Sequence, residues 1–336
     1  MKKCLFIIFI MILSVVSMAQ DIHFSQFFFS PQYLSPAEIG NFNAQYRLNA
    51  NQKTQWREVS QPYNTFALMG DGRFDFVPEE IGLGLLISND RAGDSRYNTF
   101  NFLVGGSYKY NLDESGQHAL QGGLQIGLSQ ISIDESALSF NNQYNGVVFD
   151  PNLPSGENLA RNSRWFFNLN AGALYNFTPE DRKMLTVGLA AHNLSSPKQS
   201  FFNDTGIQLP LRFSAYANAE WKVADDFDIM PSMRFMDQGT YNEFIFGSAL
   251  RYILMDERSL YRTIFAGYYG RFGDSGIAML GFELDEWRFA ASYDINVSDL
   301  KTASRNQGGF EFSLQYLFGR KERDNKFRHK FCPVYL

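Results

Sequence analysis

Ten residues near the start of the chain decide the fold: Phe42-Asn43-Ala44-Gln45-Tyr46-Arg47-Leu48-Asn49-Ala50-Asn51. Every second residue in this stretch is apolar or aromatic, and every residue between is polar. A helix would scatter the apolar residues around its surface, whereas a β-strand places alternate residues on opposite faces. The stretch therefore predicts a strand with one apolar face and one polar face.

The same alternation recurs along the chain and predicts fourteen strands. Most are about 9–12 residues long, as a tilted transmembrane strand requires. Their polar faces carry mainly Asn, Gln, Ser and Gly, which suits a barrel lumen, and an even number of strands lets the sheet close. We therefore predict an all-β fold, a transmembrane antiparallel β-barrel over residues 42–318. The expected strands are 42–52, 63–74, 81–89, 100–110, 117–129, 165–176, 184–193, 211–223, 227–236, 241–252, 263–272, 276–283, 287–294 and 308–318.

Composition excludes several other classes of protein. The 336 residues are 16% aromatic and 19% charged, and past residue 19 there is no run of 18 apolar residues, so a helical membrane bundle is excluded. A net charge of −5 argues against a nucleic-acid partner. The two cysteines, Cys4 and Cys332, cannot build a disulfide scaffold.

Residues 1–19 have the pattern of a cleavable export signal. Lys2 and Lys3 precede an apolar core from Leu5 to Val16, and Ser17-Met18-Ala19 supplies a small–x–small cleavage site. We expect an exported chain beginning at Gln20, located in the outer membrane and embedded in its lipid.

Short predicted links alternate with several long ones, as periplasmic turns alternate with external loops in outer-membrane barrels. Both ends of the barrel wall are then expected to face the periplasm. Residues 20–41 form a periplasmic N-terminal segment too apolar to remain in water, and we expect it to plug the periplasmic end of the barrel. An interfacial belt in lipid is the alternative. The aromatic residues concerned are Phe24, Phe27, Phe28 and Tyr33.

Residues 319–336 form a basic tail, expected to be periplasmic. Its docking onto a partner, or its packing under the barrel mouth, is predicted from Phe327, Phe331, Cys332 and Pro333, because a purely solvating tail would lack apolar residues. A solvated tail is the alternative.

The long external links are the candidate binding surface. Segment 130–164 is too long for a plain connection, and long loops are often functional. It is expected either to form a binding surface or to fold into the lumen as a constriction. Segments 90–99 and 194–210 complete the surface, although 90–94 also fits an ordinary charged turn. The candidate cargo or partner residues are Asp90, Arg91, Gly93, Tyr144, Phe149, Asp150, Pro151, Phe201 and Phe202.

Nothing in the sequence indicates catalysis. His23, His118, His192 and His329 have no metal-site spacing, and no nucleophile elbow is present. The glycine pairs Gly82/Gly84 and Gly122/Gly123 lie inside expected strands and indicate close packing rather than phosphate binding. We expect no enzyme activity, catalytic residue, metal, cofactor or small-molecule substrate.

An ordered set of motifs resembles the PorP/SprF family of type IX secretion system outer-membrane proteins of Bacteroidetes. The motifs are Gln20–Phe28, Ser30–Ala37, Tyr46-Arg47, Gln55-Trp56, Gly82-Leu83-Gly84, Ser88–Gly93, Phe149-Asp150-Pro151, Pro154–Glu157, Gly188–Leu194, Leu209-Pro210 and Phe331-Cys332-Pro333. The resemblance implies a non-enzymatic barrel that supports secretion or surface display of cargo with a type B C-terminal domain. It also implies that the protein acts together with periplasmic ring and translocon components and, in gliding bacteria, with motility adhesins.

A transport channel, passive or substrate-specific, is the alternative function. A porin lumen usually carries opposed clusters of charge, and we expect inward charges here to be sparse. Those predicted are Arg47, Lys109, Glu220, Arg251 and Glu311.

Overall fold

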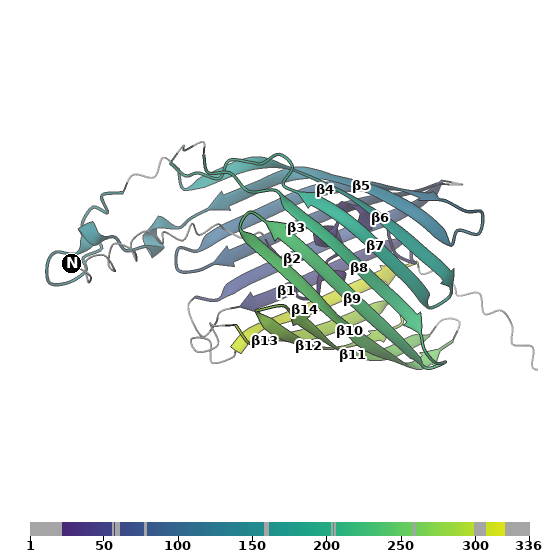
Figure 1. Ribbon diagram of the computed structural model, residues 1–336. Helices are drawn as coiled ribbons and strands as arrows, with labels where there is room; N and C mark the ends of the chain where they lie inside the picture. Colours follow the sequence, from purple (N-terminus) through teal and green to yellow (C-terminus); the bar gives the residue numbers. More distant parts are fainter. Residues whose placement is uncertain are drawn as a thin grey trace, which may run out of the picture.

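The computed structural model describes residues 22–55, 57, 61–76, 79–157, 161–202, 204, 206–257, 260–298 and 307–319. Over these residues fourteen antiparallel strands form a closed barrel, in which β14 pairs with β1 (Figure 1). The predicted fold class and strand number are confirmed. The strands are β1 Tyr46–Gln55, β2 Tyr63–Phe76, β3 Glu79–Ala92, β4 Tyr97–Asn111, β5 His118–Ser132, β6 Ser163–Glu180, β7 Lys183–His192, β8 Arg212–Lys222, β9 Phe227–Gln238, β10 Tyr241–Asp256, β11 Tyr261–Arg271, β12 Ser275–Leu284, β13 Trp287–Asn296 and β14 Gln307–Phe318.

One strand boundary was predicted wrongly for a physical reason. β1 begins at Tyr46 rather than at Phe42. The guanidinium group of Arg47 lies 4.5 Å from the centroid of the Phe42 ring, so this ring packs beside a lumen-facing side chain. Residues 42–45 continue the alternation in sequence, but they carry the chain from the lumen to the wall.

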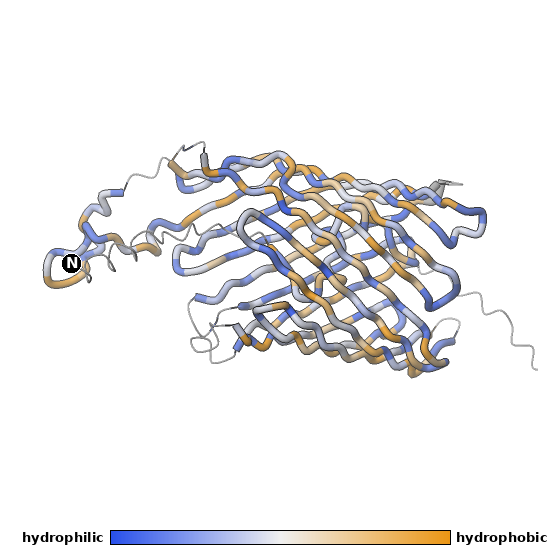
Figure 2. The backbone as a smooth tube through the Cα atoms, in the orientation of Figure 1, coloured by the Kyte–Doolittle hydropathy of each residue, from blue (hydrophilic) through white to orange (hydrophobic). Residues whose placement is uncertain are grey.

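The alternation along each strand separates lipid-facing from lumen-facing residues. On β1, Tyr46 and Leu48 are exposed, whereas Arg47, Asn49, Asn51 and Lys53 are buried. Hydrophobic and hydrophilic residues alternate along the wall in Figure 2. Within the described part of the chain, no helix is long and apolar enough to cross a membrane.

The two ends of the barrel differ. We call the end where β1 begins and β14 ends the proximal end, and the opposite end the distal end. The long links between β5 and β6 and between β7 and β8 lie at the distal end, although the distal turns after β9 and β11 are short. The β5–β6 segment projects beyond the barrel wall (Figure 1). Its described residues therefore do not fold into the lumen, and the alternative of a constriction does not apply to them.

The lumen is filled by residues 22–45, which we call the plug. It contains the short helices η1 Phe27–Phe29, α2 Pro31–Leu34 and η2 Pro36–Glu38. The two largest hydrophobic clusters of the described residues lie between plug and wall. One contains Phe27, Phe29 and Leu34, and the other contains Ile22 and Phe24.

Candidate functional site

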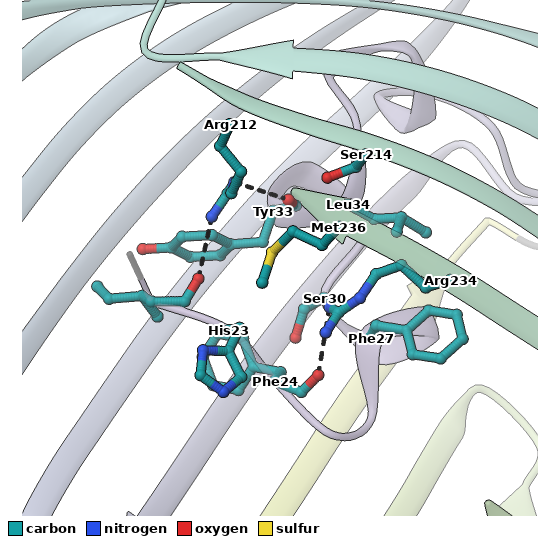
Figure 3. Close-up of a pocket in the computed structure, with 11 residues that line it drawn as sticks. His23, Phe24, Phe27, Ser30, Tyr33, Leu34, Arg212, Ser214, Arg234 and Met236 are labelled. Carbon is teal, nitrogen blue, oxygen red and sulfur yellow. Dashed lines mark hydrogen bonds between the residues drawn. The ribbon is translucent and has the colours of Figure 1, made fainter. Parts of the chain in front are cut away.

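The plug runs from the distal half of the lumen, where Ile22 lies, to the proximal end, where it joins β1. Arg212, the first residue of β8, donates to the carbonyl oxygen of Ile22 at 3.1 Å and to that of Tyr33 at 3.3 Å. Arg234 donates to the carbonyl oxygen of Phe24 at 3.4 Å (Figure 3). The segment is therefore not confined to the proximal end, and its expected place at the periplasmic end stays a prediction. The reason is that arginines near the distal rim bind its backbone.

Carboxylates on the opposite part of the wall bind the same stretch. Glu311 on β14 accepts the backbone N–H groups of Ser25 at 2.7 Å and Gln26 at 2.9 Å. The Ser25 hydroxyl donates to Asp294 at 2.8 Å. Hydrogen bonds to charged groups are the stronger ones, at about 1.5–3 kcal/mol each.

These anchors belong to a buried charge network. Arg271 pairs with Glu243 at 2.8 Å and with Asp294 at 3.1 Å, and Arg234 also pairs with Glu243. The expectation of sparse inward charge is therefore wrong. These Arg, Asp and Glu residues occupy the polar positions of the alternating strands and therefore face the lumen. There they form hydrogen bonds with the plug and ion pairs with one another, which offset the cost of burying charge.

His23 lies beside this network. Its Nε2 is 3.8 Å from the Glu243 carboxylate. Burial lowers the pKa of His23 to about 3, although Glu243 acts in the opposite direction. The imidazole is therefore neutral while the plug is docked.

A second set of contacts fixes the proximal part of the plug. The carbonyl oxygen of Ile39 accepts from Ser107 at 2.6 Å and from Gln121 at 2.7 Å, and Asp71 accepts the N–H of Gly40 at 2.8 Å. Tyr216 donates to Glu38 at 2.8 Å. Burial raises the pKa of the Glu38 carboxyl. Within the described part of the chain, hydrogen bonds join the plug to β1 to β9, β11, β13 and β14.

Glycines in the wall let the plug approach closely. A Cβ at Gly123 would lie 2.4 Å from the carbonyl group of Pro36, and one at Gly82 would lie 2.6 Å from the carbonyl oxygen of Ile39. Both distances are too short for any other residue without movement. The close-packing interpretation of these positions agrees with the structure, whereas a Cβ at Gly122 would meet nothing within 4 Å.

The gaps beside the plug differ sharply in volume. The distal gap beside His23, Arg212 and Arg234 measures about 10 Å³ (Figure 3), roughly the space of one water molecule. A cavity of about 570 Å³ lies at the proximal end, between the plug and the turns near Gln117 and Arg182. The plug thus packs tightly at the distal end and forms the floor of a proximal vestibule.

The predicted plug aromatics have distinct positions. Phe24 and Phe27 are buried, and the Tyr33 hydroxyl hydrogen-bonds Ser88. Phe28 lines the proximal vestibule. Phe327, Phe331, Cys332 and Pro333 of the tail lie outside the described residues, as does the export signal.

The predicted binding residues fall into separate groups on the distal side. Asp90 accepts from Thr65 at 2.6 Å, Arg91 is exposed, and Gly93 has a φ of +65°. Tyr144 and Phe149 face each other across a β-bridge in the projecting loop. Asp150 follows in the same loop, where its carboxylate accepts the N–H of Asn152 at 3.0 Å, and Pro151 is exposed. 

Phe201 and Phe202 lie in the β7–β8 link. Phe201 packs on Tyr97 with ring centroids 6.4 Å apart, whereas Phe202 is 57% exposed. Besides this ring contact, the pair Arg96–Asp134 at 3.0 Å joins the bases of the distal loops.

Sequence reasoning missed most of the wall residues that hold the plug. They are charged residues at polar positions of strands, and that placement was the signal that could have found them. The missed anchors include Arg212, Arg234, Glu243, Arg271 and Asp294. Among the described residues, no group of three or more His, Cys, Asp or Glu side chains could hold a metal ion.

Comparisons with known proteins give a family and a fold. The sequence model of the family described as type IX secretion system membrane protein PorP/SprF matches residues 16–316. No curated protein matches. The solved structure of the Pseudomonas putida toluene transporter TodX is similar, with a TM-score of 0.50, 9% identity, and coverage of 89% of this chain and 94% of that chain. The Ralstonia pickettii toluene transporter TbuX has a TM-score of 0.49 and 9% identity, and covers 86% of this chain and 94% of its own.

Proposed function

The chain belongs to the PorP/SprF family of type IX secretion system membrane proteins, and on that premise we propose that it is a closed outer-membrane barrel acting through protein contacts. It supports the secretion or surface anchoring of specific cargo proteins, those with a type B C-terminal domain. In a gliding bacterium these include motility adhesins. The periplasmic ring and translocon components of the system are its partners at the proximal end. It performs no catalytic step.

The observation that carries this proposal is the plug. Its backbone is held near the distal rim by charged side chains such as Arg212 and Glu311, and near the proximal rim by both charged and neutral ones, such as Asp71 and Gln121. A plug held from both sides of the lumen supports a role through protein contacts rather than as an open channel. The surfaces left for function are then the distal loops and the proximal vestibule.

A transport channel is the competing function. The proximal cavity of about 570 Å³ favours it, since small ligands occupy cavities of that size. The toluene transporter TodX is similar in fold, but 9% identity carries no function across. The tight distal packing around Arg212 and Arg234 argues against an open path.

The test compares display with permeability in the native organism. A variant lacking residues 136–160 is expected to assemble as a heat-modifiable barrel while the surface display of a particular cargo protein is lost. Uptake of small solutes is expected to match that of the wild type. Normal display by this variant would contradict the proposed role of the loops. Reduced solute uptake with normal display would favour the channel.

A further inference from the structure

The β5–β6 loop presents an unusual apolar tip. Tyr144 is 57% exposed, Val147 81%, Val148 57% and Phe149 47%. These side chains stand on a segment that projects beyond the barrel wall (Figure 1), so the lipid that covers the strands does not explain their exposure. Contiguous exposed apolar residues mark interaction sites. We call residues Tyr144–Phe149 the hairpin tip.

The hairpin tip is held in a defined conformation. Asn145 donates its N–H to the carbonyl oxygen of Val148 at 3.1 Å, and its Oδ1 accepts the N–H groups of Val147 and Val148, each at 3.0 Å. Gly146 has a φ of +95°, which side chains rarely adopt. These bonds hold the two valines outward, so little conformational entropy remains to be lost on binding.

The charge of the segment selects among partners. Residues 133–157 contain Asp134, Glu135, Asp150 and Glu157 and no Lys, Arg or His. An acidic segment is repelled by anionic lipid headgroups and attracted by a basic protein surface. Apolar insertion into the membrane is therefore disfavoured, and a basic protein partner is favoured.

We propose that the hairpin tip is a preformed knob that inserts into an apolar groove flanked by Lys or Arg side chains on a folded partner protein. This proposal rests on the proposed function, which makes the C-terminal domain of the displayed cargo the partner. The tip supplies the apolar contact, and the four carboxylates supply the charge complementarity.

The test measures binding of a recombinant type B C-terminal domain to the full-length barrel in nanodiscs. The probe is the domain of a cargo from the same organism. The double variant Val147→Ser, Val148→Ser is expected to weaken binding about tenfold or more, as loss of a central apolar anchor does. The matched control is Val297→Ser, which changes another exposed distal valine and is expected to leave affinity within about twofold.

Charge is tested separately. The variant Glu135→Lys, Glu157→Lys is expected to weaken binding at about 50 mM NaCl and to change it little at about 500 mM, because salt screens exposed charges. Unchanged affinity of the valine variant, or tighter binding of the lysine variant, would overturn the proposal. So would tip-dependent binding to phosphatidylethanolamine–phosphatidylglycerol vesicles.

The same variants distinguish this proposal from the proposed function. If display in cells requires the barrel but the valine variant displays and binds its cargo normally, the tip is not the contact and the proposed function stands. If display does not require the barrel at all, the proposed function fails.

Discussion

The carboxylate of Glu311 on the last strand accepts the backbone N–H of Gln26 at 2.9 Å, although 285 residues separate the two in the sequence. It also accepts the N–H of Ser25 at 2.7 Å. The plug is thus bound at its backbone by the strand that closes the barrel. Glu311 therefore binds the plug and also belongs to the strand that closes the barrel.

Replacing Glu311 should loosen the plug without unfolding the wall. Glu311→Ala leaves two buried N–H groups without their acceptor, which costs about 3 kcal/mol of docking free energy. Limited proteolysis should cut the plug faster while the barrel keeps its heat-modifiable migration. Ser313→Ala is the matched control, because Ser313 accepts from Asn51 in the wall rather than from the plug. Equal protection of both variants would contradict the anchoring role.

Adjacent glycines of β5 provide a paired test of close approach. Gly123→Val places a side chain against Pro36 and should displace the plug, at about 1–3 kcal/mol for overpacking. Gly122→Val changes the neighbouring residue on the outer face, where the space is open. Hydrogen exchange of the plug amides should rise in the first variant alone. A similar rise in both would show that the strand, not the contact, is responsible.

Docking of the plug should weaken in mild acid. The pKa of His23 is lowered to about 3 in the docked state from an ordinary value of 6.5. Below about 6.5 the released plug binds a proton that the docked plug does not, so docking loses about 1.4 kcal/mol per pH unit until the docked histidine also titrates. The surrounding charges are Glu243, Lys53, Arg271 and Arg234.

Protease protection between pH 7.5 and 5 measures this effect. Wild-type protection should fall with pH, and His23→Gln should remove most of the dependence. An equally steep fall in the variant would assign the effect to carboxyl groups instead of His23.

The basic tail remains a prediction from the sequence. Truncation after Gly319 keeps β14 intact, so the barrel should fold, whereas association with periplasmic partners should be lost. Cys332→Ser should have little effect, because cleavage of the expected export signal would remove Cys4 and leave this thiol without an intramolecular partner. Co-purification of the truncated barrel with its partners at wild-type yield would leave the tail without a docking role.

Much of the wall could be predicted because strand alternation is local. Leu48 and Asn49 differ in polarity, and that difference alone decides which faces lipid and which faces the lumen. The apolar character of Phe24 and Phe27 likewise indicated burial somewhere in the barrel. These inferences needed no knowledge of distant contacts.

The depth of the plug could not be predicted in this way. It depends on Arg212 meeting the carbonyl oxygens of both Ile22 and Tyr33, which are far from Arg212 in sequence. Backbone acceptors carry no sequence signature, so an inward arginine gives no sign of which segment it binds. The charge network was underestimated for the same reason.

Single-channel conductance in planar bilayers tests the central claim, a lumen closed by the plug, most directly. The wild-type barrel should conduct little or no current, because residues 22–45 fill the lumen. A variant lacking residues 20–38, refolded and checked by heat-modifiable migration, should form open channels. A wild-type barrel that conducts as well as this deletion variant would contradict the account.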